Sequence, residues 1–179
     1  KNKQPITRID KEINWVTGGG WGNNEAQYYT DDPKNVRVKN GKLIMEALKE
    51  DFYGSKYTSS RIKTKKSWKY GRFEIRAKLP RGIGTWAAFW GLPTEWKYGN
   101  WPNSGEIDVL EHVGFDEGHI VSSVHNIAHH GDLSNSDQTK HIVVDDVIST
   151  FKNYILEWDE KQIKTFVDDK LIFSYSKNY

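Results

Sequence analysis

The chain has 179 residues, contains no cysteine, and carries 26 basic against 24 acidic residues, for a net charge of +2. This length suits one domain with a substantial core, and the lack of cysteine excludes a disulfide framework and thiol chemistry. So balanced a charge argues against nucleic acid or an anionic membrane as a partner. The 8 Trp, 9 Tyr and 7 Phe in a polar chain indicate that some rings serve recognition while others fill the core.

Short stretches with period-2 alternation dominate the sequence. In chain order they are residues 36–48, 71–79, 106–113, 119–125, 153–158 and 162–175. Turn-forming residues separate them, among them Lys39-Asn40-Gly41 and the run 114–118. No stretch keeps a 3.6-residue period over three turns, so we expect an all-β fold, an antiparallel sandwich or barrel. Polar loops are expected at 91–104 and 126–141.

The segment 105–114, GEIDVLEHVG, places three carboxylates within six residues of one predicted strand. Side chains alternate along a strand, so Glu106 and Asp108 share a face, whereas the odd offset sends Glu111 to the opposite face. A β-bulge between Asp108 and Glu111 would remove this conflict, because two residues would then oppose one on the neighbouring strand. A solvated strand face with unrelated acids is the alternative.

Two carboxyl groups on one face suit glycoside hydrolysis. A retaining glycosidase holds a nucleophile and an acid/base carboxyl about 5–5.5 Å apart. Five strand residues separate the Cα atoms by more than ~10 Å, so Glu106 and Glu111 would have to lean toward each other. We expect the charge of Asp108 to raise the pKa of Glu111 and its side chain to orient the nucleophile by a hydrogen bond.

Aromatic and polar side chains elsewhere are candidates for sugar contacts. Trp86 and Trp90 lie four residues apart, so on a strand they share a face and could form a platform for a sugar chain; two core tryptophans are the alternative. Trp101 lies in a Gly/Pro-containing loop just before the acidic strand, where a purely structural Trp is less expected. Arg61 could donate to sugar hydroxyls, or could be a solvated arginine. Asn24 has the pattern of a turn residue before a strand.

Five stretches resemble glycoside hydrolase family 16, and specifically its laminarinase (endo-β-1,3-glucanase) branch. They follow the family in order and spacing and are GGGWGNNEAQYYT (18–30), TSSRIKT (58–64), YGRFEIRAKLPRGIGTWAAFWGLP (70–93), WPNSGEIDVLEHVG (101–114) and EWDEKQIKTFVDDK (157–170). The five-residue spacing of the glutamates is similar to the bulged motif of laminarinases, agarases and κ-carrageenases. In the lichenases and xyloglucan transglycosylases of the same family, the motif has a shorter form, with the glutamates four residues apart. The resemblance covers roughly residues 10–175.

The resemblance implies a β-jelly-roll sandwich of two curved antiparallel sheets, concanavalin-like, with a concave glycan cleft. It makes Glu106 the nucleophile, Asp108 the assisting carboxylate and Glu111 the acid/base of a retaining endo-hydrolase. The implied substrate is β-1,3-glucan such as laminarin, and the range extends to mixed-linkage β-1,3-1,4-glucan. The implied substrate-binding residues are Asn24, Arg61, Trp86, Trp90, Trp101 and His125.

Further expectations accompany the resemblance. No cofactor is required; a structural calcium is common in the family, but its usual terminal ligands are not found here. We expect a single catalytic domain over 1–179 that lacks the family's usual N- and C-terminal strands. We also expect a secreted monomer that binds a β-glucan polysaccharide or oligosaccharide, and neither nucleic acid nor membrane.

Three alternatives remain open. One is a hydrolase of another algal galactan, of the agarase, porphyranase or carrageenase type, which would use the same bulged strand. Another is a non-catalytic, lectin-like glucan-binding domain, although such relatives typically lose one or both glutamates. The third is a transglycosylase, because water and a sugar acceptor compete for the same covalent intermediate.

Overall fold

The computed structural model describes residues 9–12, 23–131 and 138–176, and every regular element within these ranges is a β-strand. The expected all-β class is therefore confirmed. The chain divides into two compact units, Lys1–Ser67 and Trp68–Tyr179. The single catalytic domain expected over the whole chain stays a prediction.

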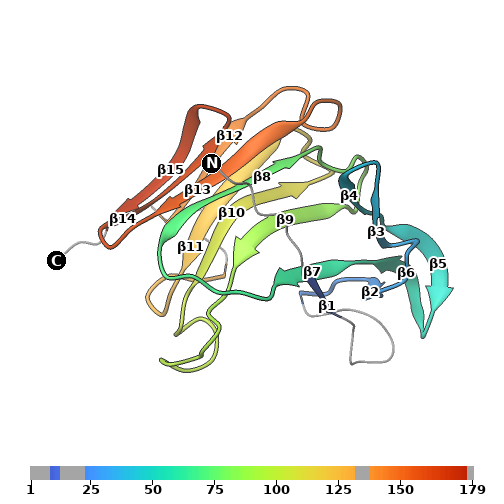
Figure 1. Cartoon of the computed structure of the whole chain (residues 1–179), viewed down its shortest axis with the longest axis horizontal. Helices are drawn as coiled ribbons and strands as arrows, with labels where there is room; N and C mark the ends of the chain where they lie inside the picture. Colours follow the sequence, from blue (N-terminus) through green and yellow to red (C-terminus); the bar gives the residue numbers. More distant parts are fainter. Residues whose placement is uncertain (1–8, 13–22, 132–137, 177–179) are drawn as a thin grey trace. The chain divides into compact units, whose positions relative to one another are not determined.

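Short strands form three small sheets in the first unit. The strands are β1 (Ile9–Glu12), β2 (Gln27–Tyr29), β3 (Val36–Lys39), β4 (Lys42–Met45), β5 (Leu48–Phe52), β6 (Ser55–Ser59) and β7 (Arg61–Thr64). β1 pairs with β7, β3 pairs with β4, and β6 lies between β5 and β2 (Figure 1). The β2–β6 pair is parallel, unlike the antiparallel pairing expected from the sequence.

The β3–β4 hairpin shows how local sequence determines an element. Asn40 and Gly41 have φ angles of +53° and +71°, and they connect Lys39 to its partner Lys42. A two-residue loop with both φ angles positive matches the right-handed twist of the flanking strands, and Asn-Gly adopts it readily. The expected turn is confirmed, and it divides the predicted stretch 36–48.

Eight strands of the second unit form two four-stranded antiparallel sheets (Figure 1). One, which we call the site sheet, has the order β12-β11-β10-β9, and the other, the back sheet, has the order β15-β14-β13-β8. The strands are β8 (Gly71–Ala77), β9 (Trp86–Gly91), β10 (Glu106–Val113), β11 (His119–His125), β12 (Thr139–Val143), β13 (Lys152–Trp158), β14 (Gln162–Val167) and β15 (Lys170–Ser176).

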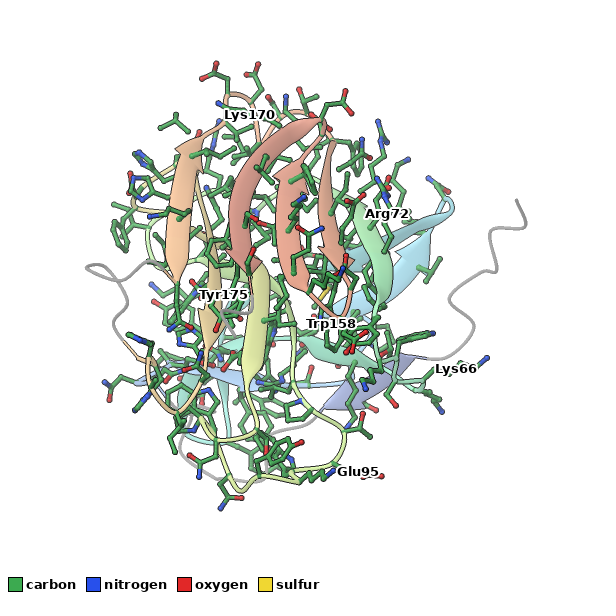
Figure 2. All side chains as sticks on the ribbon, turned by 90° about the vertical axis from the view of Figure 1, so that its left-hand side faces the viewer. Lys66, Arg72, Glu95, Trp158, Lys170 and Tyr175 are labelled. Carbon is green, nitrogen blue, oxygen red and sulfur yellow. The ribbon has the colours of Figure 1, made fainter. Side chains whose placement is uncertain are left out.

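The core of this unit lies between the two sheets. Each sheet contributes buried apolar side chains to it: Val109, Leu110, Ile120 and Val124 from the site sheet, and Tyr154, Leu156, Ile163, Val167, Ile172 and Phe173 from the back sheet. Figure 2 looks onto the back sheet, with Lys170 and Tyr175 on β15 and Arg72 on the outer strand β8. Since one face of the site sheet is committed to this core, its other face is available for polar side chains.

Two sequence expectations differ from the observed elements. β12 begins at Thr139, inside the expected polar loop 126–141. This strand lies at a sheet edge with part of its surface in solvent, so polar residues such as Lys140 and His141 can occupy it. The predicted stretch 162–175 is divided into two strands that are joined at Asp168 and Asp169.

Candidate active site

The acidic strand β10 carries the β-bulge that its sequence requires. Against β11, Asp108 pairs with Ser123 and Glu111 pairs with Val121. Two residues of β10 therefore oppose Ser122 alone, and the register shifts by one position. Glu106 pairs with His125, so all three acids align with positions two apart on β11 and share one face. The predicted bulge is confirmed.

The tryptophans of β9 face the same side as the acids. Trp90 pairs with Asp108, and the next positions on that face, Ala88 and Trp86, pair with Glu111 and Val113. The interpretation that Trp86 and Trp90 share a face is confirmed. Trp86 is 54% exposed, which excludes it from the core.

Each acid of this face has its own hydrogen-bonding partner. The Trp101 indole Nε1 donates to Glu106 Oε2 at 2.5 Å, and the Trp86 indole Nε1 donates to Glu111 Oε1 at 3.0 Å. His125 Nε2 lies 3.0 Å from Asp108 Oδ2. Six of the predicted site residues are thus brought together in three pairs by direct contacts.

A pocket of about 190 Å³ opens on this face, lined by Trp86, Glu111, Val113 and Val121. Its lining is mostly apolar, with the Glu111 carboxyl as its acidic group. An indole beside a carboxyl suits a sugar ring, which presents apolar C–H groups and an oxygen to be protonated.

A loop side chain completes the other end of the site. The Trp101 ring lies 6.0 Å from the His125 ring and contacts the His130 ring edge-on at 5.5 Å, measured between centroids. The loop 92–105, which connects β9 to β10, folds so that Trp101 reaches the side chain of Glu106, five residues later in the sequence.

Burial raises the pKa of the three carboxyls. For Glu106 burial and the neighbouring Asp108 charge raise the pKa to about 7, against the hydrogen bond from Trp101, which lowers it. The pKa of Asp108 is raised mainly by burial, and its contact with His125 opposes that shift. The pKa of His125 is itself raised by Asp108, so these groups titrate as one cluster.

The pKa of Glu111 is raised, but not for the reason expected from the sequence. Burial is the main cause, and the like charge that contributes is that of Glu106 rather than Asp108. Because the pKa values of both glutamates are raised, those values do not assign the nucleophile and the acid. The roles of Glu106 and Glu111 stay predictions.

A Trp101→Phe variant is expected to retain the aromatic face and lose the N–H that favours the ionised form of Glu106. The pKa of Glu106 should therefore rise, and the acidic limb of the kcat/KM profile should move to higher pH. We expect roughly a tenfold lower kcat/KM at pH 6, about 1.4 kcal/mol, from the loss of one charge-assisted hydrogen bond. A pH profile on a soluble glucan measures it; an unmoved acidic limb would contradict the prediction.

Two predicted substrate-binding residues belong to the first unit. Asn24 is exposed and has a φ of +58°, as a turn residue would. Arg61 begins β7 and is partly buried. Their place in a glycan cleft stays a prediction.

Sequence reasoning missed two residues behind the bulge, Ser122 and Thr165. Both side chains are fully buried. The Ser122 hydroxyl contacts the backbone of β10 directly, and the Thr165 hydroxyl contacts that of Ser122. Ser and Thr are common in alternating strands, so the residue types alone do not mark these two positions. Only the strand register, which places Ser122 opposite the bulge, identifies them.

Within residues 9–12, 23–131 and 138–176, no group of three or more His, Asp or Glu side chains could hold a metal ion. The expectation that no cofactor is required stays a prediction. In the same part of the chain, no helix is long and apolar enough to cross a membrane.

Comparison with known proteins gives consistent results. The family profile of glycosyl hydrolases family 16 matches residues 22–179. The beta-glucanase of Rhodothermus marinus is 46% identical over 165 residues, which cover 89% of this chain and 57% of that protein. The glucan endo-1,3-beta-glucosidase of Cryptopygus antarcticus is 36% identical over 167 residues, which cover 88% of this chain and 60% of that protein. The chain therefore spans less than two thirds of the length of these relatives.

Solved structures agree with the sequence comparison. The X-ray structure of the laminarinase from Rhodothermus marinus superposes with a TM-score of 0.88 at 43% sequence identity, covering 97% of this chain and 69% of that one. The β-jelly-roll expected from the sequence is thereby confirmed. With the profile match over most of the chain, the identity to these relatives and the shared fold, this chain belongs to glycosyl hydrolase family 16.

Proposed function

We propose that the chain is a retaining endo-hydrolase of β-1,3-glucan, with mixed-linkage β-1,3-1,4-glucan as a second substrate. The observation that carries the proposal is the bulge of β10, which puts Glu106 and Glu111 on one face. Each glutamate has its own indole donor there. The names of the two sequence relatives, a beta-glucanase and a glucan endo-1,3-beta-glucosidase, support the substrate class.

The proposed reaction is a double displacement. The Glu106 carboxylate attacks the anomeric carbon while Glu111 gives its proton to the departing glycosidic oxygen, which leaves a glycosyl ester on Glu106. Glu111, now ionised, takes a proton from water, and the water oxygen displaces Glu106 from the same carbon. The two inversions retain the β configuration.

The neighbouring side chains have supporting roles in this scheme. Trp101 holds one oxygen of Glu106 by a hydrogen bond, and Asp108 is a second hydrogen-bonding partner of the same carboxyl. Burial holds Glu111 protonated at a pH where an exposed glutamate is ionised. The charge of Asp108, which is paired with His125, raises the pKa of Glu106 and so helps to set the lower pH limit at which the nucleophile is ionised.

Product analysis tests the proposal. Laminarin, barley mixed-linkage glucan, agarose and carboxymethylcellulose would each be incubated with the chain, and the reducing ends and the oligosaccharide sizes followed. We expect a ladder of oligosaccharides from laminarin, and no product from agarose. Products from agarose alone would contradict the proposed glucanase function and indicate a galactan hydrolase. If the chain binds laminarin but releases no product, and circular dichroism shows that the sample is folded, the result would favour a binding domain.

The same proposal includes a secreted monomer that requires no cofactor. The polymeric substrate supports secretion, since a long glucan is too large to enter a cell. Sedimentation of the purified chain and activity after treatment with a chelator would test the monomer and the cofactor statements.

A further inference from the structure

Two buried hydroxyls connect the bulge of β10 to the opposite sheet. The Ser122 hydroxyl on β11 donates to the Val109 carbonyl at 2.7 Å, and the Thr165 hydroxyl on β14 donates to the Ser122 oxygen at 2.8 Å. The side chains of Ser122 and Thr165 are both fully inaccessible to solvent. This chain of hydroxyls crosses the core from the back sheet to the site sheet.

This pair of hydrogen bonds, which we call the relay, ends at the bulge itself. Ser122 is the residue of β11 that two residues of β10 oppose, and Val109 is one of those two. A bulge interrupts the regular ladder, and a carbonyl left buried without a partner would cost about 1–3 kcal/mol. Val109 and Leu110 are each only 2% exposed, so no solvent reaches this point to supply a substitute.

Thr165 also lies at an irregular position of its own sheet. The register of β14 against β15 shifts between Thr165 and Phe166, where Ile172 is the additional residue. The relay therefore joins the irregular points of the two sheets.

The bulge decides which side chain faces the substrate. In a regular strand, the parity of β10 would turn Glu111 into the core and bring His112 to the acidic face. In the observed register His112 is 1% exposed on the core side, where its Nε2 accepts a hydrogen bond from the Gly118 N–H. Any loss of the bulge thus removes the proposed acid/base from the site.

We propose that Ser122 and Thr165 are positioning residues for catalysis, because their relay to the Val109 carbonyl holds the bulge that presents Glu111. This inference rests on the proposed function, and it deepens it by assigning residues that touch no substrate. It predicts that kcat depends on buried hydroxyls on the far side of the catalytic strand.

The first test compares Ser122→Ala with the parent on laminarin. We expect kcat to fall ~10–100-fold with KM changed less than threefold, since a displacement of about 1 Å in a reacting group can cost that much. Thr165→Val removes only the second hydroxyl and should lose ~3–10-fold in kcat, while Thr165→Ser keeps the hydroxyl and should stay within twofold of the parent. A kcat within twofold in Ser122→Ala overturns the proposal.

A stability control separates positioning from general weakening of the core. Val167→Ala removes apolar volume from the same strand as Thr165, two residues away, without touching the relay. All variants would be compared at a temperature where circular dichroism shows each of them folded. A loss of kcat in Val167→Ala equal to that in Ser122→Ala would also overturn the proposal.

A second readout does not depend on activity. In the parent, burial holds the pKa of His112 below its usual value. If Ser122→Ala displaces the bulge, His112 loses part of its burial, and its pKa measured by NMR should rise toward its usual value. An unchanged His112 pKa in that variant contradicts the proposal. Should the parent release nothing from laminarin, the proposed function fails, while this titration still tests the relay.

Discussion

The Glu106→Gln variant is expected to lose at least about 10³-fold in turnover of laminarin while remaining folded and becoming more stable than the parent at neutral pH. Turnover is lost because an amide cannot form the glycosyl ester. Stability is gained because the parent holds a carboxyl in a buried site beside Asp108. The hydrogen bond from Trp101 can still be made, since the amide oxygen accepts it.

The stability gain has a defined dependence on pH. An unfolded Glu106 ionises near pH 4.5, whereas the folded pKa is about 7. Between these values the folded chain retains a proton that the unfolded chain releases, so the parent loses stability as pH rises through this window. The gain of the variant is therefore absent near pH 4, grows up to pH 7 and stays constant above it. After allowance for the partial exposure of Glu106 it is about 1–2 kcal/mol.

Thermal unfolding at pH 4 and pH 8 measures this effect. We expect the variant to unfold about 2–6 °C above the parent at pH 8 and at the same temperature at pH 4. Glu160→Gln is a matched control, because Glu160 is exposed in the β13–β14 turn. This substitution should change neither the turnover nor the pH-dependence of the turnover. Turnover near the parental rate would show that Glu106 is not the nucleophile.

The second large effect is expected for Glu111→Ala, and it separates the roles of the two glutamates. On laminarin this variant should lose at least about 10³-fold in kcat, because a glucosyl hydroxyl leaves poorly without a proton donor. On a dinitrophenyl laminaribioside, whose leaving group needs no proton, the first step should proceed and the glycosyl ester should accumulate. Added azide should then restore turnover, since this anion attacks without a general base.

The configuration of the azide product decides the assignment. Attack on an ester of Glu106 gives the β-glycosyl azide, with net retention. In a Glu106→Ala variant azide can only take the place of the nucleophile, and the product should be the α-glycosyl azide. An α product from Glu111→Ala would exchange the two roles. NMR of the anomeric proton distinguishes the products.

Much of the candidate site could be predicted from sequence parity. The offset between Glu106 and Glu111 demanded an extra residue on the strand if both acids were to act together, and β10 has it. The four-residue spacing of Trp86 and Trp90 likewise predicted their shared face. Parity is informative here because each side chain of a strand faces one of only two sides of the sheet.

Other features depend on loop paths and on packing, which the period-2 pattern does not specify. The Trp101 hydrogen bond to Glu106 requires a particular loop path, and period-2 patterns say nothing about loops. The cause of the raised pKa of Glu111 was predicted wrongly, since burial is set by packing around the site rather than by the neighbouring charge in the sequence. Ser122 and Thr165 are 43 residues apart and meet only across the core.

The two-against-one register of β10 has a consequence for how such a site can change through mutation. A point substitution at one of the acids alters the group at that position but leaves every other residue of the strand on its face. Removal of a single codon between Asp108 and Glu111 would instead place Glu111 at an even offset from Glu106, so that a regular strand without the bulge would keep the acids on one face. Codon replacement at the acidic positions therefore changes the chemistry of this face at a fixed spacing of the acids, and only in-frame insertions or deletions reach a different spacing.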